Sequence, residues 1–448
     1  MANYQMPRGT QDLLPADSMK WIKLEALLRQ FTYVYNYQEI RTPIFEHTEV
    51  FKRGNDSSDM VNKEMYTFTD NGGRSLTLRP EGTAGVARSF VENKMFGYAD
   101  MPVKMYYMGP QFRYERPQKG RLRIFHQFGV EVIGAKNPYL DVEVIALGYS
   151  IITALGLKKC KVLLNTLGDD ESRNAYRQAL KEHFKDGIQN MCTDCQRRYE
   201  QNPLRILDCK VDADSALMKT APKMRDYLNE SSKEYFTKVC EGLKALGIPF
   251  EIEDRLVRGL DYYTHTVFEL ISESEEMGSQ STVLAGGRYD GMVEYFGGPS
   301  VSGIGWAMGM ERLLIALESE GIDLNEEEQL DAYILCLSEK VSVQALQITT
   351  QLRSAGYRCD TDYLNRSFKA QFKTVERKHA KMAIIVGEKD IENGTVTIKN
   401  IADQTNTTVA LDDIVDAMDR IFMDEEEHEH AHECSCGNEH CTCHQEEE

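Results

Sequence analysis

Three arginines, Arg113, Arg258 and Arg312, stand where predicted strands end, begin or lead into a helix. Guanidinium groups in such positions can bind phosphate or carboxylate groups. Arg258 precedes "LDYYTHTVFEL", whose β-branched and aromatic residues predict a strand. The strand does not need that cation to form. Arg258 therefore either pairs with a structural carboxylate, for which Asp261 is a candidate, or faces an anionic ligand.

Arg312 follows "GIGWAMGME", a strand of small residues that opens a helix. The N-terminus of a helix favours an anion, and an arginine in its first turn strengthens that preference. Tight packing between the strand and the helix, with a surface arginine, explains the same residues equally well.

Polar residues also alternate along a predicted hairpin, "FRYERPQKGRLRIFHQFGVE". Strand periodicity places Arg113 and Glu115 on one face, and it does the same for Gln127, Gly129 and Glu131 on the returning strand. Such a face, with a glycine leaving room, suits a small polar ligand, and a basic loop suits phosphates. Taken alone, a solvated sheet face is the more ordinary explanation. The loop contains Arg116, Lys119, Arg121 and Arg123.

A carboxylate and a hydroxyl stand two residues apart in "TLRPEGTAG", just after another predicted strand. Glu81 and Thr83, with Gly82 allowing a tight backbone, could hold an ammonium group. Thr83 as the N-cap of a helix is an equally good interpretation.

The elements that must position these residues predict an α+β fold with an antiparallel sheet flanked by helices. A helix is expected over 18–31 and a strand over 160–167. A helical insertion is expected over about 169–246, before the strands "LDYYTHTVFEL", "TVLAGGRYDG" and "GIGWAMG". We expect this first domain to span residues 1–325.

A second domain is predicted over residues 331–423, where strands and helices alternate in the manner of a partly parallel α/β sheet. Its segment "NRSFKAQFKTVERKHAK" is strongly basic. Helical spacing places four of its cations on one face, where they could contact phosphates or simply be solvated. These cations are Arg366, Lys369, Lys373 and Arg377.

Composition limits the class of protein. The chain has 448 residues with 42% hydrophobic and 27% charged residues, as in globular proteins. We find no run long and apolar enough for a membrane span and no signal peptide, so we expect a cytoplasmic protein without membrane contact. The net charge is −19, of which residues 424–448 contribute ten negative charges, leaving −9 for the rest. This argues against nonspecific nucleic-acid binding but allows local basic patches.

Eleven cysteines in a chain of this length do not suggest a disulfide framework. Cys192, Cys195 and Cys209 could bind zinc, but no fourth ligand is obvious, so reduced thiols are the simpler interpretation. The acidic tail, residues 424–448, should be disordered and could bind a transition metal. Its candidate ligands are His428, His430, His432, Cys434, Cys436, His440, Cys441, Cys443 and His444.

Taken together, these segments resemble a known family. "FRYE" with its basic loop and "RIF", and then "GMER", resemble motifs 2 and 3 of class II aminoacyl-tRNA synthetases, and "TPIFEH" resembles motif 1. "LVRGLDYYTHTVFEL" and "GGRYDGMVEYFGG" resemble two peptides specific to the histidyl-tRNA synthetase family, which "MPRGTQDLLP" and "LRPEGTAG" also match. The resemblance covers residues 6 to about 422.

The resemblance implies a class II core, a C-terminal anticodon-binding domain and a homodimer. It implies that L-histidine and ATP, with Mg2+ bound to the phosphates, form histidyl-adenylate and pyrophosphate. Histidine then moves to the 3′ end of the histidine tRNA. The basic face of the second domain would contact that tRNA.

The resemblance also implies a histidine pocket. Glu81 and Thr83 would hold the α-ammonium group, with Gly82 between them. Glu131 would accept a hydrogen bond from the imidazole, and Arg258 would lie at the same site. The pocket would be completed by Gln127, Tyr262 and Tyr263. In a regular strand the two tyrosines would point to opposite faces. Either the strand begins irregularly or one tyrosine lies outside the pocket, and we expect both to approach it.

For ATP, the resemblance implies that Arg113 and Arg258 stabilise the α-phosphate and that Phe125 stacks on the adenine. Arg312 would meet the nucleotide from the other side, and Glu115 would also contact it. Two alternatives are a non-catalytic regulatory relative in histidine biosynthesis and a metal-handling protein. Such regulatory relatives typically lack the anticodon module and the intact arginine peptide, and both are present here.

Overall fold

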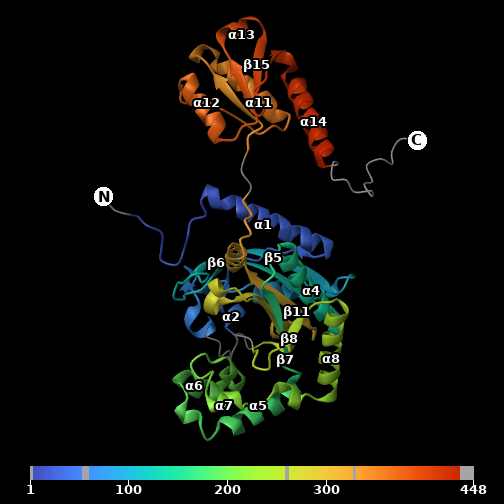
Figure 1. The fold of residues 1–448 in the computed structure, drawn as a ribbon. Helices are drawn as coiled ribbons and strands as arrows, with labels where there is room; N and C mark the ends of the chain where they lie inside the picture. The colour runs from blue at the N-terminus through green and yellow to red at the C-terminus, as the bar shows by residue number, and fades with distance from the viewer. Residues whose placement is uncertain (1–3, 53–59, 258–261, 326–328, 434–448) are drawn as a thin grey trace, which may run out of the picture. The chain divides into compact units, whose positions relative to one another are not determined.

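The computed structural model describes residues 4–52, 60–257, 262–325 and 329–433. It forms two units, Met1–Asn325 and Glu326–Glu448 (Figure 1). Among the described helices, none combines the length and the apolar character that crossing a membrane requires.

The first unit is built on an eight-stranded sheet with the order β1-β5-β6-β11-β10-β9-β7-β8. Its inner strands pair antiparallel, which confirms the predicted fold class. The two edge pairs, β1 with β5 and β7 with β8, are parallel, a feature that local patterns did not predict. The strands are β1 (Gln38–Glu39), β5 (Val103–Phe112), β6 (Ile124–Ile133), β7 (Cys160–Thr166), β8 (Phe250–Ile252), β9 (Thr264–Ser272), β10 (Thr282–Tyr289) and β11 (Gly303–Gly309).

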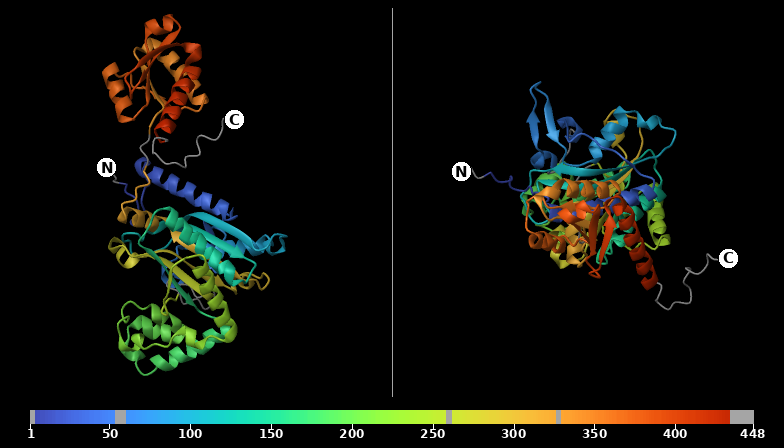
Figure 2. Two further views of the ribbon diagram at one scale, coloured as in Figure 1. Left: turned by 45° about the vertical axis from the view of Figure 1, so that its right-hand side comes forward. Right: turned by 90° about the horizontal axis from the view of Figure 1, so that it is seen from above.

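Four helices cover one face of this sheet: α1 (Pro15–Val34), α4 (Pro138–Ala154), α8 (Glu230–Ala245) and α10 (Met310–Ser319). Helices α1 and α4 lie against each other over the sheet (Figure 2). Alternation along β6 decides which residues meet them. Phe128, Val130 and Val132 are fully buried in this core. The intervening residues of β6 therefore face the other side of the sheet, where a ligand can enter.

Smaller elements cover part of the other face. A three-stranded sheet runs in the order β2-β4-β3, and Val86 and Phe90 of α3 pack on Met105, Tyr107 and Ile133 of the large sheet. These elements are β2 (Phe45–His47), β3 (Thr67–Thr69), β4 (Ser75–Leu78), α2 (Thr48–Phe51), α3 (Thr83–Glu92), α9 (Met292–Tyr295), a π-helix (Met60–Glu64) and a 3-10 helix (Met95–Gly97). Another 3-10 helix, Glu275–Gln280, packs on α10 on the first face, with Met277 in the main core.

The segment between β7 and α8 is helical and has a hydrophobic core of its own. Asp169 caps its first helix by accepting a hydrogen bond from Ser172 N at 2.9 Å. Its core also includes Val257 and Tyr263, which follow β8. Helix α8, the last part of the predicted insertion, packs on α4 and belongs to the main core. The insertion comprises α5 (Asp170–Phe184), α6 (Thr193–Gln201), α7 (Ala216–Lys219) and 3-10 helices (Ile188–Asn190, Pro203–Asp208, Met224–Tyr227).

The second unit has a five-stranded sheet of order β13-β12-β14-β15-β16. Strand β12 pairs parallel with β13 and β14, as expected, and the remaining pairs are antiparallel. The edge strand β16 was not predicted, because "NTTVA" lacks apolar alternation. The elements are β12 (Ala332–Cys336), β13 (Cys359–Thr361), β14 (Met382–Val386), β15 (Thr395–Asn400), β16 (Asn406–Ala410), α11 (Ser342–Ser354), α12 (Phe368–Arg377), α13 (Glu388–Glu392), α14 (Ile414–Glu433) and 3-10 helices (Glu339–Val341, Leu411–Asp413).

Helix α14 continues to Glu433, so the prediction of disorder from residue 424 is wrong for residues 424–433. Alanine and glutamate are good helix formers, and the segment continues an existing helix, which removes the nucleation cost. His428, His430 and His432 lie in this helical extension. The remaining candidate metal ligands of the tail, Cys434, Cys436, His440, Cys441, Cys443 and His444, lie outside the described residues.

Candidate active site

A cavity of about 430 Å³ lies in the first unit. Residues from the β4–α3 turn, the sheet strands β5, β6, β9, β10 and β11, helix α10 and the insertion line it. Nine of the residues predicted from sequence lie together in its wall. They are Glu81, Thr83, Arg113, Phe125, Gln127, Glu131, Tyr262, Tyr263 and Arg312. Arg258 lies outside the described residues.

Glu81 is held at the N-terminus of α3. Its carboxylate accepts hydrogen bonds from the backbone N–H groups of Thr83 at 2.6 Å and Ala84 at 3.0 Å. The alternative interpretation of Thr83 as the helix N-cap is therefore wrong: Thr83 is the first helical residue, and the Glu81 side chain accepts hydrogen bonds from N–H groups of the first turn. This arrangement fixes a buried carboxylate in the cavity wall, where its remaining lone pairs can accept further hydrogen bonds.

Glu131 connects two segments that are far apart in the sequence. It accepts a hydrogen bond from the Thr83 hydroxyl at 2.6 Å and another from the Tyr289 hydroxyl at 2.6 Å. Burial raises the pKa of Glu131 to about 8, although both hydrogen bonds act in the opposite direction. Nearby on β6, the Oε1 atom of Gln127 is buried without a hydrogen-bond partner among the described residues. A buried acceptor of this kind favours a polar ligand in the cavity.

Tyr107 fills the space that Gly129 was expected to leave for a ligand. The two residues face each other across the β5–β6 pair, and a Cβ atom on Gly129 would lie 2.3 Å from the Tyr107 ring. A Cβ atom on Gly82 would lie 2.2 Å from the same ring. Both glycines are therefore required for close packing around Tyr107, and Gly82 shapes the cavity without lining it.

Tyr262 and Tyr263 both reach the cavity because the strand begins later than predicted. Strand β9 starts at Thr264, so the alternation rule does not apply to the two tyrosines. Their ring centroids lie 4.6 Å apart. His265 has a φ of 45° and interrupts the early part of the strand. The backbone carbonyl of Tyr263 accepts a hydrogen bond from Arg173 at 2.8 Å. Contacts with the insertion thus help to hold this turn.

Arg113 lies over the ring of Phe125, with its Cζ atom 4.1 Å from the ring centroid. Its Nε atom is buried without a hydrogen bond among the described residues, and Glu115 Oε2 lies 3.6 Å away. Strand β5 ends at Phe112, so the prediction that Arg113 and Glu115 share a strand face is wrong. Glu115 is buried beside the cavity and pairs with Arg121, which lines it.

Arg312, in the first turn of α10, extends into the same part of the cavity. It donates to the backbone carbonyls of Gly120 and Thr282, each at 3.1 Å. Burial, together with repulsion by Arg113 and Arg121, lowers the pKa of Arg312 to about 10. Cations that lie this close together in a cavity, and that lower the pKa of Arg312, favour the binding of an anion there.

Sequence reasoning missed several residues of the cavity wall. Tyr107 could have been found from its register opposite Gly129, and Tyr289 from its place in "GGRYDG". Glu269 and Thr282 were not predictable, because they come from adjacent strands whose pairing only the fold decides. The Thr282 hydroxyl donates to Glu269 at 2.9 Å, and both residues line the cavity.

The basic face predicted in the second unit is only partly on one helix. Lys369, Lys373 and Arg377 are exposed on α12 at intervals of four residues. Arg366 lies before the helix begins, so its assignment to the helical face is wrong. Its guanidinium pairs with Asp362 and donates to Thr374 Oγ1 at 3.1 Å.

Comparison with known proteins agrees with this geometry. Residues 9–313 match the family model described as "Histidyl-tRNA synthetase", and residues 331–421 match the model "Anticodon binding domain". The chain belongs to the histidyl-tRNA synthetase family. The family predicted from the sequence motifs is confirmed.

Similar proteins extend over nearly the whole chain. The histidine–tRNA ligase of Anoxybacillus flavithermus is 53% identical over 94% of this chain and 100% of its own length. That of Bacillus cytotoxicus is 54% identical over 91% of this chain and 97% of its own length. The crystal structure of apo Staphylococcus aureus histidyl-tRNA synthetase has a TM-score of 0.80 and 44% identity, covering 93% of this chain and 100% of that chain.

Proposed function

We propose that this chain is a histidine–tRNA ligase, which activates L-histidine with ATP and transfers the histidyl group to the 3′ end of the histidine tRNA. The observation that carries the proposal is the separation of carboxyl and guanidinium side chains in the cavity. The carboxyl groups of Glu81 and Glu131 lie in one part of it, and the guanidinium groups of Arg113 and Arg312 lie in another. Phe125, beneath Arg113, and Glu131 are six residues apart on β6, or about 20 Å along the strand. A cationic amine and an anionic phosphate can both be bound there.

In this proposal Glu81 and the Thr83 oxygen accept hydrogen bonds from the α-ammonium group. Glu131 and Gln127 pair with the imidazole, and the two tyrosines preceding β9 close the pocket. Support comes from the hydrogen bonds that fix Glu81 and Glu131 before the substrate arrives. A buried site built to hydrogen-bond the imidazole rejects amino acids without it, because its own polar groups would then be left unpaired.

Arg113 is proposed to bind the α-phosphate, and Arg258 is assigned the same role by its sequence motif alone. Negative charge grows on the α-phosphate oxygens as the carboxylate of histidine attacks, so fixed guanidinium groups lower the barrier. Phe125 would stack on the adenine, with Arg312 on its other side and Glu115 holding the loop through Arg121. The Arg113 guanidinium lies over one face of the Phe125 ring. Adenine binding therefore uses the opposite ring face or displaces this arginine.

Mg2+ would enter with the ATP phosphates. Magnesium prefers oxygen ligands and needs few from the protein when phosphates supply the rest. Glu269 fits this requirement, because its carboxylate lines the cavity and lies close enough to Arg312 to affect its pKa. The metal would neutralise phosphate charge, while the arginines and Glu269 orient the nucleotide.

We also propose tRNA and a second copy of the chain as partners. Lys369, Lys373 and Arg377 would contact tRNA phosphates. The dimer would form through the motif 1 region, where Ile44, Phe45 and Phe68 are 46%, 52% and 42% exposed. Exposed apolar side chains clustered in this way favour a protein interface. Because the second unit matches an anticodon binding domain, the synthetase is favoured over a regulatory relative that lacks one.

ATP–pyrophosphate exchange tests the proposal directly. We expect exchange that depends on L-histidine and does not occur with other amino acids. Histidine attachment should then require the histidine tRNA. Absence of histidine-dependent exchange in folded protein with Mg2+ present would contradict the proposed activity.

A further inference from the structure

A second chemical site lies in the insertion, formed by three cysteines and one aspartate. The ligand atoms of Cys192, Cys195, Cys209 and Asp212 all lie within 4.8 Å of one another. Cys192 immediately precedes α6, and Cys195 lies in its first turn. Cys209 and Asp212 follow the 3-10 helix Pro203–Asp208. The sequence offered no obvious fourth ligand for the three thiols, and the structure supplies Asp212.

Two distances within this cluster are close to the edges of a tetrahedron around one small ion, and all the others are within 4.8 Å. Zinc binds thiolate sulfur at about 2.3 Å and carboxylate oxygen at about 2.0–2.2 Å, which sets tetrahedral edges of about 3.8 Å between sulfurs and about 3.5 Å between sulfur and oxygen. The Sγ atoms of Cys192 and Cys209 are 3.6 Å apart, and Cys209 Sγ lies 3.5 Å from Asp212 Oδ2. The four groups therefore need little movement to enclose an ion.

Backbone groups orient the same side chains. The N–H of Cys192 donates to Asp212 Oδ2 at 3.0 Å, and the N–H of Asp212 points to Cys209 Sγ at 3.4 Å. Cys195 is fully buried and Cys209 is 5% exposed. Such supporting contacts and burial are typical of metal-binding side chains.

We propose that Cys192, Cys195, Cys209 and Asp212 bind one structural zinc ion in the insertion. Thiolate ligands select zinc over magnesium or calcium, and four protein ligands leave no open position for catalysis. Zinc is bound by the thiolate form of cysteine, so each coordinating thiol gives up its proton to solvent as the ion binds.

The site would fix part of the cavity wall. Cys209 stands between Asp208 and Lys210, and both of these neighbours line the cavity. Leu207 and Cys209 also share a core with Val257 and Tyr263. A zinc ion would therefore anchor the "LDCK" segment against the turn that carries the pocket tyrosines. Small helical units with modest cores often need such a metal link.

Thiol mapping on the full-length wild-type chain tests the site without relying on catalysis. Protein loaded with zinc and freed of loosely bound metal is alkylated with iodoacetamide, with and without a strong chelator, and each thiol is followed by peptide mass spectrometry. We expect Cys192, Cys195 and Cys209 to be protected together and to become reactive together on chelation. Because peptides are read separately, the tail cysteines do not interfere. Equal alkylation in both conditions, or a Cys192–Cys209 disulfide in freshly isolated protein, would overturn the proposal.

Variants identify the fourth ligand. Asp212→Asn should weaken zinc binding, measured by competition with a chromophoric chelator, by at least about 10- to 100-fold, the loss typical even for supporting residues. Asp212→Cys should retain the zinc and keep the three native thiols protected. Cys240→Ser, a half-buried cysteine of α8 outside the cluster, should change nothing. Asp212→Asn with unaltered zinc affinity and thiol protection would exclude the carboxylate as a ligand.

Discussion

The hydroxyl of Tyr289 donates a hydrogen bond to Glu131 Oε2 at 2.6 Å, and each of these two side chains is only 1% exposed. Tyr289 comes from β10 and Glu131 from β6, and strand β11 lies between them in the sheet. A carboxyl group is thus held in the wall of the cavity by partners that the fold alone brings to it. Burial raises the pKa of Glu131 to about 8, so its protonation changes near neutral pH.

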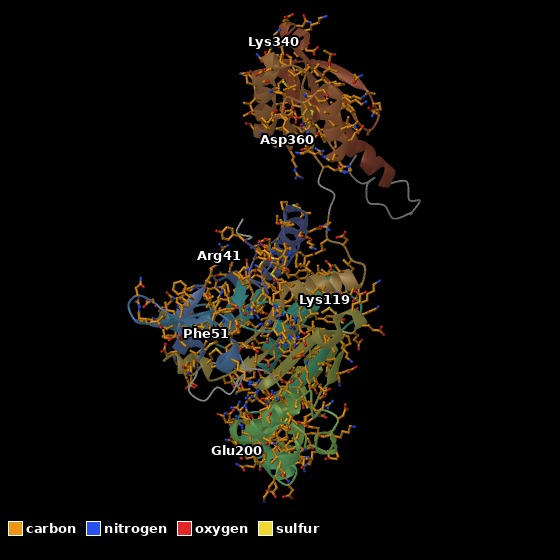
Figure 3. All side chains as sticks on the ribbon, turned by 90° about the vertical axis from the view of Figure 1, so that its left-hand side faces the viewer. Arg41, Phe51, Lys119, Glu200, Lys340 and Asp360 are labelled. Atoms are coloured by element: carbon orange, nitrogen blue, oxygen red, sulfur yellow. The ribbon has the colours of Figure 1, made fainter. Side chains whose placement is uncertain are left out.

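Glu131→Gln should change how stability depends on pH. The folded pKa of Glu131 is above its ordinary value of 4.5, so between pH 4.5 and about 8 the folded chain retains a proton that the unfolded chain has lost. The wild type therefore loses stability as pH rises through this window, by up to about 1.4 kcal/mol per pH unit from this group. The glutamine variant lacks this contribution. Denaturant unfolding at pH 5, 6, 7 and 8 measures the difference. The exposed Glu200→Gln (Figure 3) is the control. Parallel slopes for wild type and Glu131→Gln would show that Glu131 is ionised in the folded chain.

Tyr289→Phe should weaken histidine binding. The change removes one hydrogen bond to the buried Glu131. The free-energy cost of leaving a buried hydrogen-bonding group without its partner is about 1–3 kcal/mol. We expect the KM for histidine in the exchange reaction to rise about tenfold or more, with a smaller effect on the KM for ATP. Tyr295→Phe is a matched control, because Tyr295 is 45% exposed and donates to the Glu49 carbonyl. If both variants behave alike, Tyr289 does not act through the histidine pocket.

Arg113→Gln should reduce the rate of exchange far more than it reduces histidine binding. A group that stabilises developing charge contributes mainly in the transition state, and its loss lowers kcat by about 10²–10³-fold. Equilibrium dialysis with histidine should give a dissociation constant close to that of the wild type. Arg29→Gln, at a surface ion pair on α1, provides the control. An unchanged kcat in Arg113→Gln would contradict the proposed contact between Arg113 and the α-phosphate.

Charge reversal on α12 should separate tRNA charging from adenylate formation. We expect Lys369→Glu combined with Lys373→Glu to weaken tRNA binding and to reduce the salt dependence of that binding by a slope of about 2, one per phosphate contact. Exchange without tRNA should be unaffected. The control reverses two exposed lysines elsewhere in this unit, Lys340 (Figure 3) and Lys389. Equal losses in both double variants would indicate a general charge effect and no specific face.

Arg288→Met should destabilise the first unit strongly. Arg288 and Asp141 are both fully buried, and the arginine Nε donates to Asp141 Oδ1 at 3.1 Å. Removing one partner of a buried ion pair costs about 3–5 kcal/mol, because the other charge is left uncompensated. The double variant Arg288→Met with Asp141→Leu should recover much of this loss in a thermal unfolding experiment. Arg41→Met, which removes a pair that is 79% exposed at the arginine, should leave the melting temperature close to that of the wild type.

The sequence alone determined the family, the fold class and most of the residues proposed to bind substrate. The sequence predicted a helix directly after the strand of small residues, with Arg312 in its first turn, and α10 (Met310–Ser319) begins there. Gln127 and Glu131 were placed on the correct face of β6 by alternation alone. These features are local, because the spacing of apolar residues in a strand or a helix depends only on residues that are close in the sequence.

Tertiary structure decided which distant groups meet. Glu131 bonds to Thr83 and Tyr289, which are 48 and 158 residues away in the chain, and no spacing rule links such positions. Arg113 and Glu115 do not lie on the predicted strand face, because β5 ends at Phe112, before both of them. Asp212 lies beside the three cysteines because the chain that follows the 3-10 helix Pro203–Asp208 folds back next to α6. Periodicity describes one element at a time, whereas a site is made by the packing of several elements in three dimensions.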